Sequence, residues 1–495
     1  MKYLVTAEEM RRYDANTIER IGIPAMVLME RAALAASQVV REYCVNKRVA
    51  SPTALILAGI GNNGGDGLAL ARLLCEDGFR VELWTVGNSD GASGQWREQR
   101  KILESYPVEM STKPKRREYT VIIDALFGVG LSREIKGEYL EAVELFGELA
   151  GHRIALDVPS GVDSDTGKIW GKAVRVDETV TFGFSKRGLV LYPGCEYAGK
   201  VTVADIGISS RCFFGEEPGM FFCDEPMQEL LPKRQSDGNK GTFGKVLLIA
   251  GSRNMAGAAI LAAKSAYRIG AGMVKIITPE DNRVIIQETI PEALLGTPED
   301  LAESLRWADV VAIGPGLGKD ENAFTCLERV ITECDKPLLI DADGLNLLVE
   351  HSKWAERLSA QGAAGRVLVL TPHVGELARL TGETVSSLKE NLVLYGSALA
   401  KEMHAVVVAK DARTYVCAQG RPVGVNVSGN CGMATAGSGD VLAGIVIGMM
   451  AQGESAFEAA LSGVRIHGLA GDAASMRLGE HACMAGDIIE ELGLM

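Results

Sequence analysis

Two series of short β-rich runs, each alternating with helical stretches, constrain the fold of this chain more than any other feature. The first series predicts strands at 54–58, 81–86, 120–124, 154–157, 178–182 and 200–205. The second predicts strands at 245–250, 274–278, 310–313, 338–341, 367–370 and 406–409. Strands that alternate with helices form parallel sheets covered by helices on both faces, so the sequence predicts an α/β protein with two sheets.

A less regular stretch around 209–239 separates the two series. Its Glu-Glu-Pro-Gly and Ser-Asp-Gly segments are typical of loops, and 495 residues exceed what one hydrophobic core usually supports. We therefore expect two domains, at 1–220 and 221–495.

The composition excludes several classes of partner. A formal net charge of −13 argues against a nucleic acid and against an anionic membrane surface. The apolar stretch 441–453 is shorter than the roughly 20 residues that span a bilayer. The 10 cysteines and 6 histidines show no spacing typical of disulfides or zinc. No apolar leader follows Met1, so we expect a cytoplasmic protein. We also expect small-molecule substrates and a homo-oligomer.

The stretch 429–440 ends in the glycine-rich turn Gly437-Ser438-Gly439, followed by Asp440 and an apolar helix expected near Val441. Glycine has no Cβ, so backbone N–H groups can close on a phosphate at the positive end of the helix dipole. Asp440 is then placed to take a proton from an attacking hydroxyl. The motif predicts a phosphoryl-transfer site, although glycine followed by aspartate also occurs as a plain helix cap.

A second glycine-rich segment, 59–67, follows the predicted strand 54–58 and spells G-x-G-x-x-G, and a helix is expected to begin after it at Leu68. This fingerprint makes an NAD dehydrogenase one alternative. Its ribose-binding acidic residue should end the second strand, however, whereas Glu82 lies inside that strand. The turn also carries side-chain oxygens that suit a cation or a ligand's ribose and phosphate, on Asn62, Asn63 and Asp66.

Polar residues also end two further strands of the first series, in the segments 124–133 and 157–163. Asp124 and Asp157 can each simply cap a turn. Three strand ends with such residues nevertheless favour a ligand site, because doubly wound sheets bind ligands at the carboxyl edge.

The segments 59–67, 124–133 and 156–161 together resemble the NAD(P)H-hydrate epimerase family, a YjeF N-terminal domain with a Rossmann-like three-layer sandwich. The resemblance implies a potassium ion held by Asn63, Asp124 and Ser160. It also implies contacts to the hydrated dinucleotide from Asn62, Asn63, Gly64, Gly65, Asp66, Gly128, Val129, Gly130, Leu131, Ser132, Arg133, Glu134 and Asp157. Inversion at C6 needs a group that helps the hydroxyl leave and return on the other face, and Asp157 is our candidate acid/base.

The segments 251–259, 314–318, 371–376 and 429–440 resemble the ADP- or ATP-dependent NAD(P)H-hydrate dehydratases, which have a ribokinase-like α/β fold. The resemblance implies contacts to the hydrate from Ala258, Gly316, His373 and Asp440. It implies contacts to the adenine nucleotide from Lys410, Asp411, Ala412, Arg413, Thr414 and Gly439. Asp440 would deprotonate the C6 hydroxyl as it attacks the nucleotide, with Mg²⁺ bridging the phosphate charges and Asp343 and Glu376 near the ion.

The pairing of both domains resembles the bifunctional NAD(P)H-hydrate repair enzymes, which implies epimerisation of the R and S hydrates and dehydration of the S form with ADP or ATP. The chain departs from the family pattern at Asp411, Arg413, Cys431, Ala436 and Ser438, and the charge of Asp411 bears on nucleotide affinity.

Two other functions stay open at the level of sequence. The second half can be a ribokinase-like small-molecule kinase, which would leave a stable phosphoester as its product. The first half can be a non-catalytic dinucleotide-binding module, although the retained Asp157 argues against this.

Overall fold

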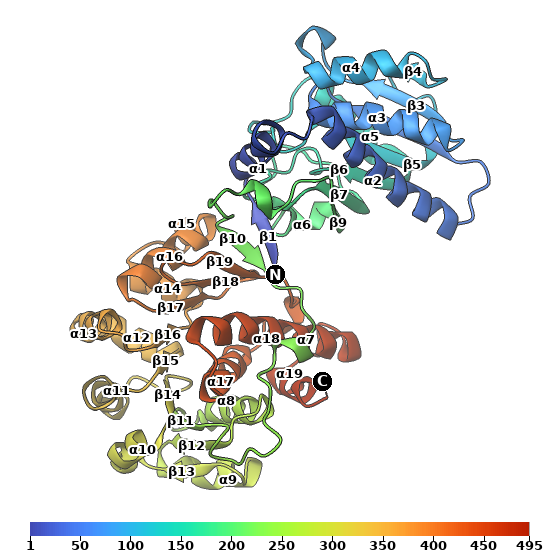
Figure 1. Cartoon of the computed structure of the whole chain (residues 1–495). Coiled ribbons are helices and arrows are strands. Elements are labelled where there is room, and N and C mark those ends of the chain that lie inside the picture. The colour runs from blue at the N-terminus through green and yellow to red at the C-terminus, as the bar shows by residue number, and fades with distance from the viewer. Residues whose placement is uncertain (495) are drawn as a thin grey trace. The chain divides into compact units, whose positions relative to one another are not determined.

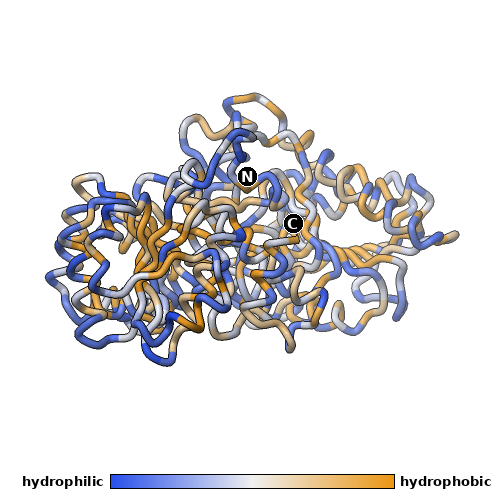
Figure 2. Tube along the Cα trace, turned by 90° about the horizontal axis from the view of Figure 1, so that it is seen from below, coloured by the Kyte–Doolittle hydropathy of each residue, from blue (hydrophilic) through white to orange (hydrophobic). Residues whose placement is uncertain are grey.

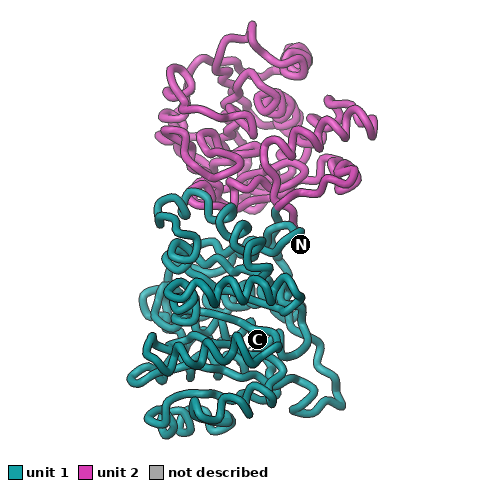
Figure 3. Tube along the Cα trace, turned by 90° about the vertical axis from the view of Figure 1, so that its left-hand side faces the viewer, with its two compact units in different colours: residues 1, 220–495 teal, residues 2–219 magenta. Residues whose placement is uncertain are grey.

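Each of the two predicted strand series forms its own sheet in this computed structural model, which describes residues 1–494. Contacts divide the chain into two units, one of residues Lys2–Gly219 and the other from Met220 onward with Met1 (Figure 3). In Figure 2 hydrophobic segments gather in the interior of the trace, and hydrophilic segments lie mostly along its outside. No helix within 1–494 has both the length and the apolar character needed to cross a membrane.

The unit Lys2–Gly219 is built on seven parallel strands in the order β4-β3-β2-β5-β6-β7-β9 (Figure 1). Their bounds are β2 Thr53–Ala58, β3 Arg80–Thr85, β4 Glu109–Ser111, β5 Glu118–Ala125, β6 Ala150–Leu156, β7 Glu178–Phe182 and β9 Lys200–Ala204. Six of them confirm the predicted strands, and the short β4 is an addition. Outside this sheet, β1 (Lys2–Val5) pairs in parallel with β8 (Ser185–Lys186).

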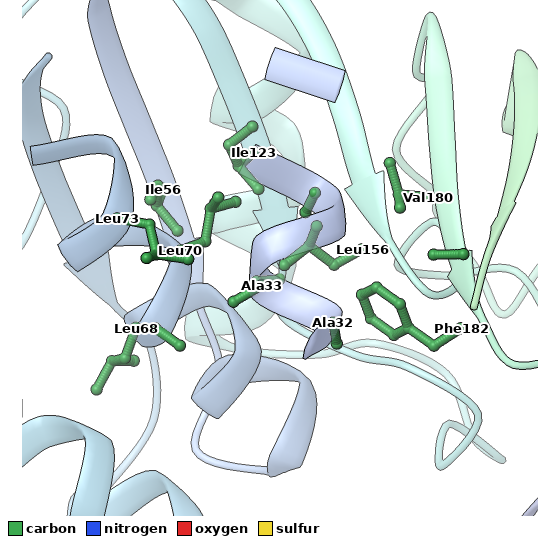
Figure 4. Packing of buried hydrophobic residues seen from close by; sticks show 14 of the residues in the cluster. Ala32, Ala33, Ile56, Leu68, Leu70, Leu73, Ile123, Leu156, Val180 and Phe182 are labelled. Atoms are coloured by element: carbon green, nitrogen blue, oxygen red, sulfur yellow. The ribbon is translucent and has the colours of Figure 1, made fainter. Parts of the chain in front are cut away.

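Helices cover both faces of this sheet, as the three-layer prediction requires. On one face Ile56 and Ile123 pack with Leu70 of α3 and Ala33 of α2 (Figure 4). On the other face the alternate strand residues pack around Phe146 of α5. The helices of the unit are α1 Ala7–Ala15, α2 Ala25–Asn46, α3 Asn62–Glu76, α4 Gly94–Leu103, α5 Glu138–Glu148 and α6 Cys195–Ala198, with a π-helical turn at Asn16–Ile21.

The glycine-rich segment after β2 forms the first turn of α3 rather than a separate loop, so the predicted helix start near Leu68 was wrong. A Cβ on Gly64 would lie 1.8 Å from the carbonyl oxygen of Gly59, and a Cβ on Gly59 would lie 2.2 Å from that of Leu126. The glycines therefore allow the N-terminus of α3 to pack directly against the backbone at the ends of β2 and β5.

The second unit carries strands in the order β13-β12-β11-β14-β15-β16-β17-β18-β19-β10. All neighbours are parallel except β18, which is antiparallel to both β17 and β19. Their bounds are β10 Met220–Phe222, β11 Lys245–Ile249, β12 Met273–Ile277, β13 Leu294–Gly296, β14 Val310–Ile313, β15 Leu338–Ile340, β16 Leu368–Leu370, β17 Val406–Ala409, β18 Thr414–Cys417 and β19 Val423–Asn426. The six predicted strands are confirmed as β11, β12 and β14 to β17.

Two groups of helices flank this sheet (Figure 1). One contains α8 Ala256–Arg268, α17 Ser438–Ala451, α18 Ala456–Leu478 and α19 Ala485–Leu492. The other contains α10 Leu301–Trp307, α11 Glu321–Glu333, α12 Ala342–Glu350, α13 Ser352–Ala363, α14 Val374–Thr381, α15 Val385–Glu390 and α16 Leu392–Glu402. The remaining helices are α7 Met227–Leu230 and α9 Arg283–Thr289.

Helix α17 packs unusually closely on α8. A Cβ on Gly444 would lie 2.1 Å from the carbonyl oxygen of Ala262, and a Cβ on Gly448 would lie 2.4 Å from the side chain of Ile269. Glycines one turn apart thus bring the two helix backbones together. Helix α17 begins at Ser438 rather than near Val441 as expected, so Asp440 is part of the helix. The contact between α17 and α8 therefore also fixes the position of Asp440 relative to α8.

Two candidate active sites

A cleft of about 600 Å³ lies at the carboxyl ends of β2, β5 and β6, beside the first turn of α3. The predicted residues that line it are Asn62, Asn63, Asp66, Gly128, Val129, Gly130, Leu131 and Asp157. Helix α1 adds Met10, Arg11 and Asp14, which the sequence did not mark. The structure therefore brings the polar residues of three strand ends into one cleft.

A second cleft of about 700 Å³ shares Phe127, Leu131 and Tyr139 with the first. It is lined by the other predicted residues of that loop, Ser132, Arg133 and Glu134. Gly64 and Gly65 line neither cleft, because both face inward from α3. A Cβ on Gly65 would meet the methyl group of Met29 at 2.7 Å.

Asp157 forms an ion pair with a lysine that the sequence analysis missed. Lys186 Nζ lies 2.5 Å from Asp157 Oδ1, and its side chain is only 1% exposed. The ammonium also donates to Thr181 Oγ1 and to the carbonyl oxygen of Phe182. A buried lysine with a single carboxylate partner is rare outside functional sites, so Lys186 belongs to the site.

The backbone at Asp157 is strained. The residue follows β6 instead of ending it, and its φ of 67° lies in the left-handed region that non-glycine residues seldom adopt. A Cβ on Gly128 would lie 3.0 Å from Asp157 Oδ2. Glycine at position 128 therefore keeps the cleft open in front of the carboxylate.

Two further carboxyl groups share this cleft. Asp66 is 9% exposed, and burial, followed by the nearby Asp157 and Asp14, raises its pKa well above the ordinary value. Burial and Asp157 also raise the pKa of Asp14. Both groups therefore favour the protonated acid more than an exposed aspartate does.

Of the three residues predicted to hold potassium, Asn63 lines the cleft, whereas Asp124 and Ser160 line neither cleft. Asp124 is fully buried, and it accepts hydrogen bonds from Ser160 N and Ser160 Oγ, both at 2.7 Å. Burial raises the pKa of Asp124 to about 6 in spite of these donors. Both amide atoms of Asn63 are buried without a hydrogen-bond partner among the described residues.

These residues fit a monovalent cation. The orphaned amide oxygen of Asn63, the hydroxyl of Ser160 and the buried carboxylate of Asp124 provide one negative charge and neutral oxygens. Within 1–494 no cluster of three or more His, Cys, Asp or Glu residues is placed to hold a metal ion. A transition-metal site of that kind is therefore absent from the described chain.

The second candidate site lies at the ends of β15, β16 and β17. Asp341 is 2% exposed and accepts hydrogen bonds from Thr371 Oγ1 at 2.7 Å and from Lys410 Nζ at 2.8 Å. The same ammonium would lie 3.4 Å from a Cβ on Gly439, in the first turn of α17. A positive charge and a helix N-terminus thus meet at one point, which suits a phosphate.

Asp440 lies in the first turn of α17, beside these groups. Burial, together with the nearby Asp341 and Asp343, raises its pKa to about 7, although Lys410 acts in the opposite direction. The site therefore holds a carboxylate that is close to half ionised at neutral pH, as a general base requires.

Residue His467 of α18 packs behind the same turn, with Nε2 3.3 Å from Ser438 Oγ. Burial and the nearby Lys410 lower the pKa of His467 to about 4, so its ring is neutral at neutral pH. The contact holds Ser438, at the start of α17, in place.

The residues predicted to touch the substrate converge on the same edge of the sheet. A Cβ on Gly316, whose φ is +57°, would lie 2.7 Å from Ala258 Cβ, so the two residues are in direct contact. His373 caps α14 through Nδ1, which accepts from Gly375 N at 2.9 Å, and its ring is 54% exposed. A parallel backbone β-bridge joins His373 to Lys410.

The segment predicted to bind the nucleotide forms the tight connection from β17 to β18. Lys410 points inward to Asp341, whereas Asp411 and Ala412 are exposed. Arg413 Nη1 donates to the carbonyl oxygen of Val427, and Thr414 Oγ1 donates to that of Asp411. Asp343 accepts from Gly318 N at 2.8 Å, and Glu376 is paired with His373.

Both halves of the chain match known proteins. A family model described as NAD(P)H-hydrate dehydratase matches residues 246–492, and one described as YjeF-related protein N-terminus matches 25–188. A bifunctional NAD(P)H-hydrate repair enzyme of Moorella thermoacetica is 34% identical and is aligned over 99% of this chain and 96% of its own length. That of Thermofilum pendens is 35% identical over 95% of this chain and 92% of its own.

Among solved structures, a ribokinase-like superfamily protein from Enterococcus faecalis is 28% identical, with a TM-score of 0.50. The match covers 56% of this chain and 95% of that one. The predicted fold classes of both halves are confirmed.

Proposed function

Because the chain belongs to the family of bifunctional NAD(P)H-hydrate repair enzymes, we propose that its first unit interconverts the R and S hydrates of NADH and NADPH, and that its second unit dehydrates the S form with ADP or ATP. The observation that carries the proposal is the pair of an aspartate and a buried lysine at the carboxyl edge of each sheet. Asp157 with Lys186 serves proton transfer in the first unit, and Asp440 beside Lys410 serves phosphoryl transfer in the second.

In the first unit Asp157 is the acid/base group. Epimerisation at C6 requires the hydroxyl to leave as water and a new water to add from the other face, so protons must move at two oxygens. Asp157 Oδ1 takes the proton of the water that adds, and Lys186, 2.5 Å away, stabilises the carboxylate and fixes its direction. The hydrate lies along the cleft lined by Asn62, Asp66 and Gly128 to Leu131. Its phosphates lie toward Arg133 and Lys136 in the adjoining cleft.

Potassium would be held by Asn63, Asp124 and Ser160. There the cation would compensate the buried charge of Asp124 and would give the Asn63 amide oxygen a partner. It would also fix the first turn of α3 and the loop after β5, whose residues Asn62 and Gly128 line the cleft.

In the second unit Asp440 takes the proton from the C6 hydroxyl as that oxygen attacks the terminal phosphorus of the nucleotide. The N–H groups of the first turn of α17 and the ammonium of Lys410 stabilise the charge of the transferred phosphoryl group. Phosphate is a far better leaving group than hydroxide, so loss of phosphate restores the dihydronicotinamide ring. Mg²⁺ supplied with the nucleotide would neutralise the charge of its phosphates, and Asp343, whose charge acts on Asp440, is the carboxylate that would hold it.

The test supplies the purified protein with both hydrate epimers, K⁺, Mg²⁺ and ADP or ATP, and measures the absorbance of the reduced nicotinamide. We expect complete recovery with release of free phosphate. Asp157→Asn should stop at the fraction that began as the S epimer, whereas Asp440→Asn should stop recovery but still equilibrate the epimers. A stable phosphoester in place of free phosphate would instead identify a small-molecule kinase.

Homo-oligomeric assembly, a cytoplasmic location and the use of potassium stay predictions. Size-exclusion chromatography with light scattering tests the homo-oligomeric assembly. A titration of potassium chloride, with the epimerisation rate as the readout, tests the use of potassium.

A further inference from the structure

The epimerase cleft contains an acid that the mechanism above does not use. Asp66 lines the cleft, is only 9% exposed, and forms no hydrogen bond or ion pair with any residue of the described chain. A buried carboxyl group without a partner is costly, and native proteins rarely keep one without a functional reason.

Asp66 and Asp157 reach the cleft from different elements. Asp66 is the fifth residue of α3, just after its first turn, whereas Asp157 follows β6 and is held by Lys186. Asp14 of α1 lines the same cleft and raises the pKa of Asp66, as does burial, the largest cause. The cleft thus contains one carboxyl group paired with an ammonium and one whose surroundings favour its protonated form.

The two epimers carry their hydroxyl on opposite faces of the dihydronicotinamide ring. A single carboxyl group on one face cannot serve both oxygens, because proton transfer requires hydrogen-bond distance to each. We propose that Asp66 is a second catalytic acid/base, which acts on the ring face opposite to that of Asp157. This inference rests on the proposed epimerase function of the first unit.

Asp66 gives its proton to the C6 hydroxyl, the C6–O bond breaks with its electron pair going to oxygen, and the lone pair of the ring nitrogen forms a C=N bond. A water then adds to C6 from the other face, its lone pair forms the new C–O bond, and its proton goes to Asp157. The site is left with Asp66 ionised and Asp157 protonated, which is the state required for the reverse reaction.

The experiment uses the full-length protein without nucleotide, so that no dehydration occurs, and supplies each single epimer in H₂¹⁸O. The variants are Asp66→Asn and Asp157→Asn, and the control is Asp77→Asn at the exposed C-terminal end of the same helix. Chromatography gives the epimer ratio and mass spectrometry gives the label in each epimer, with the reaction without protein subtracted.

We expect the parent and the control to invert and to label both epimers. Each active-site variant should lose inversion by about 10² or more, since it lacks one of the two acid/base groups. Each should still exchange label without inversion in one epimer, and the labelled epimer should differ between the two variants.

Loss of exchange in both epimers by a folded Asp66→Asn, or inversion close to the parent rate, would overturn the proposal. Folding is checked by thermal unfolding and by nucleotide-dependent dehydration of the S epimer, which the second unit should carry out unchanged. If Asp66→Asn does not fold, Asp66→Ser replaces it with the same expected pattern. Absence of both inversion and exchange in the parent would refute the epimerase function itself, so the two failures are distinguishable.

Discussion

The raised pKa of Asp440 should appear as a pH dependence of the dehydratase reaction. A general base must be ionised to accept a proton, and burial together with Asp341 and Asp343 raises the pKa of Asp440 from 3.8 to about 7. With that pKa, roughly one-tenth of the carboxyl groups are ionised at pH 6 and roughly nine-tenths at pH 8. We therefore expect kcat/KM to rise about tenfold from pH 6 to pH 8, whereas an aspartate at its ordinary pKa would give a flat profile over this range.

The variant Asp343→Asn tests the cause of the shift. It removes one of the negative charges that raise the pKa of Asp440, so the rise in kcat/KM should move to lower pH. Its amide oxygen can still accept the hydrogen bond from Gly318 N, which limits structural change. The assay follows nucleotide-dependent recovery of reduced-nicotinamide absorbance from the S hydrate at substrate concentrations below KM. A flat profile in the parent, or an unshifted one in Asp343→Asn, would refute this account of the base.

The same shift has a consequence for stability. The folded-state pKa of Asp440 lies above the unfolded value, so ionisation of Asp440 opposes folding. This free-energy cost is absent below about pH 4 and grows as the pH rises to about 7. Asp440→Asn should therefore raise the free energy of unfolding at pH 8 by up to about 4 kcal/mol, and by little at pH 4. Thermal unfolding at the two pH values measures the difference, and an equal effect at both would contradict the linkage.

The remaining predictions concern the cation and the helix contact. Asp124→Ala should slow epimerisation and abolish its dependence on potassium chloride, while dehydration of pure S hydrate stays at the parent rate; parallel loss of both reactions would indicate misfolding instead. Gly444→Ala should lower the free energy of unfolding by about 1–3 kcal/mol, because its Cβ would lie 2.0 Å from Ser265 Oγ. The control is Gly257→Ala, on α8, where an added Cβ would have no atom within 4 Å, so the free energy of unfolding should stay unchanged or rise by up to about 1 kcal/mol. Chemical denaturation measures both variants, and a similar result for the two would exclude the clash as the cause.

The central strands of both sheets were predictable because they are continuous apolar runs bounded by turn residues. The strands that the sequence did not show are of other kinds. At one sheet edge, β4 is the polar run Glu109–Ser111, and β18 and β19 form an antiparallel extension that alternation with helices does not signal. Such strands depend on neighbours that are remote in sequence rather than on their own hydrophobicity.

Helix starts at the two glycine-rich segments were placed too late for a common reason. Glycine in a sequence suggests a loop, yet in α3 and α17 it occupies the first helical turn. What favours glycine there is contact with a second backbone, as at Gly64 against Gly59, and that contact exists only once the sheet has formed.

The sequence marked Asp157 and Asp440 because each follows a strand or a glycine-rich turn at a sheet edge. It did not mark Lys186 or Asp14, which reach the cleft by other routes. Lys186 arrives after the chain reverses from β7 to β8, and Asp14 lies on α1, before the first residue of the matching family model. Charge pairing in a buried site is a property of the folded chain, so residue type and spacing alone did not reveal it.

The two sites use a buried lysine in opposite ways, and the difference follows from which carboxylate the lysine touches. Lys186 contacts Asp157 itself, so the ion pair fixes the direction of the acid/base carboxyl group. Lys410 contacts Asp341 instead, which holds the ammonium beside the N-terminus of α17, while Asp440 keeps a pKa of about 7. A lysine paired with Asp440 directly would lower that pKa and weaken the base. Asp341 therefore lets one site hold a positive charge for phosphate and a carboxylate basic enough to deprotonate a hydroxyl.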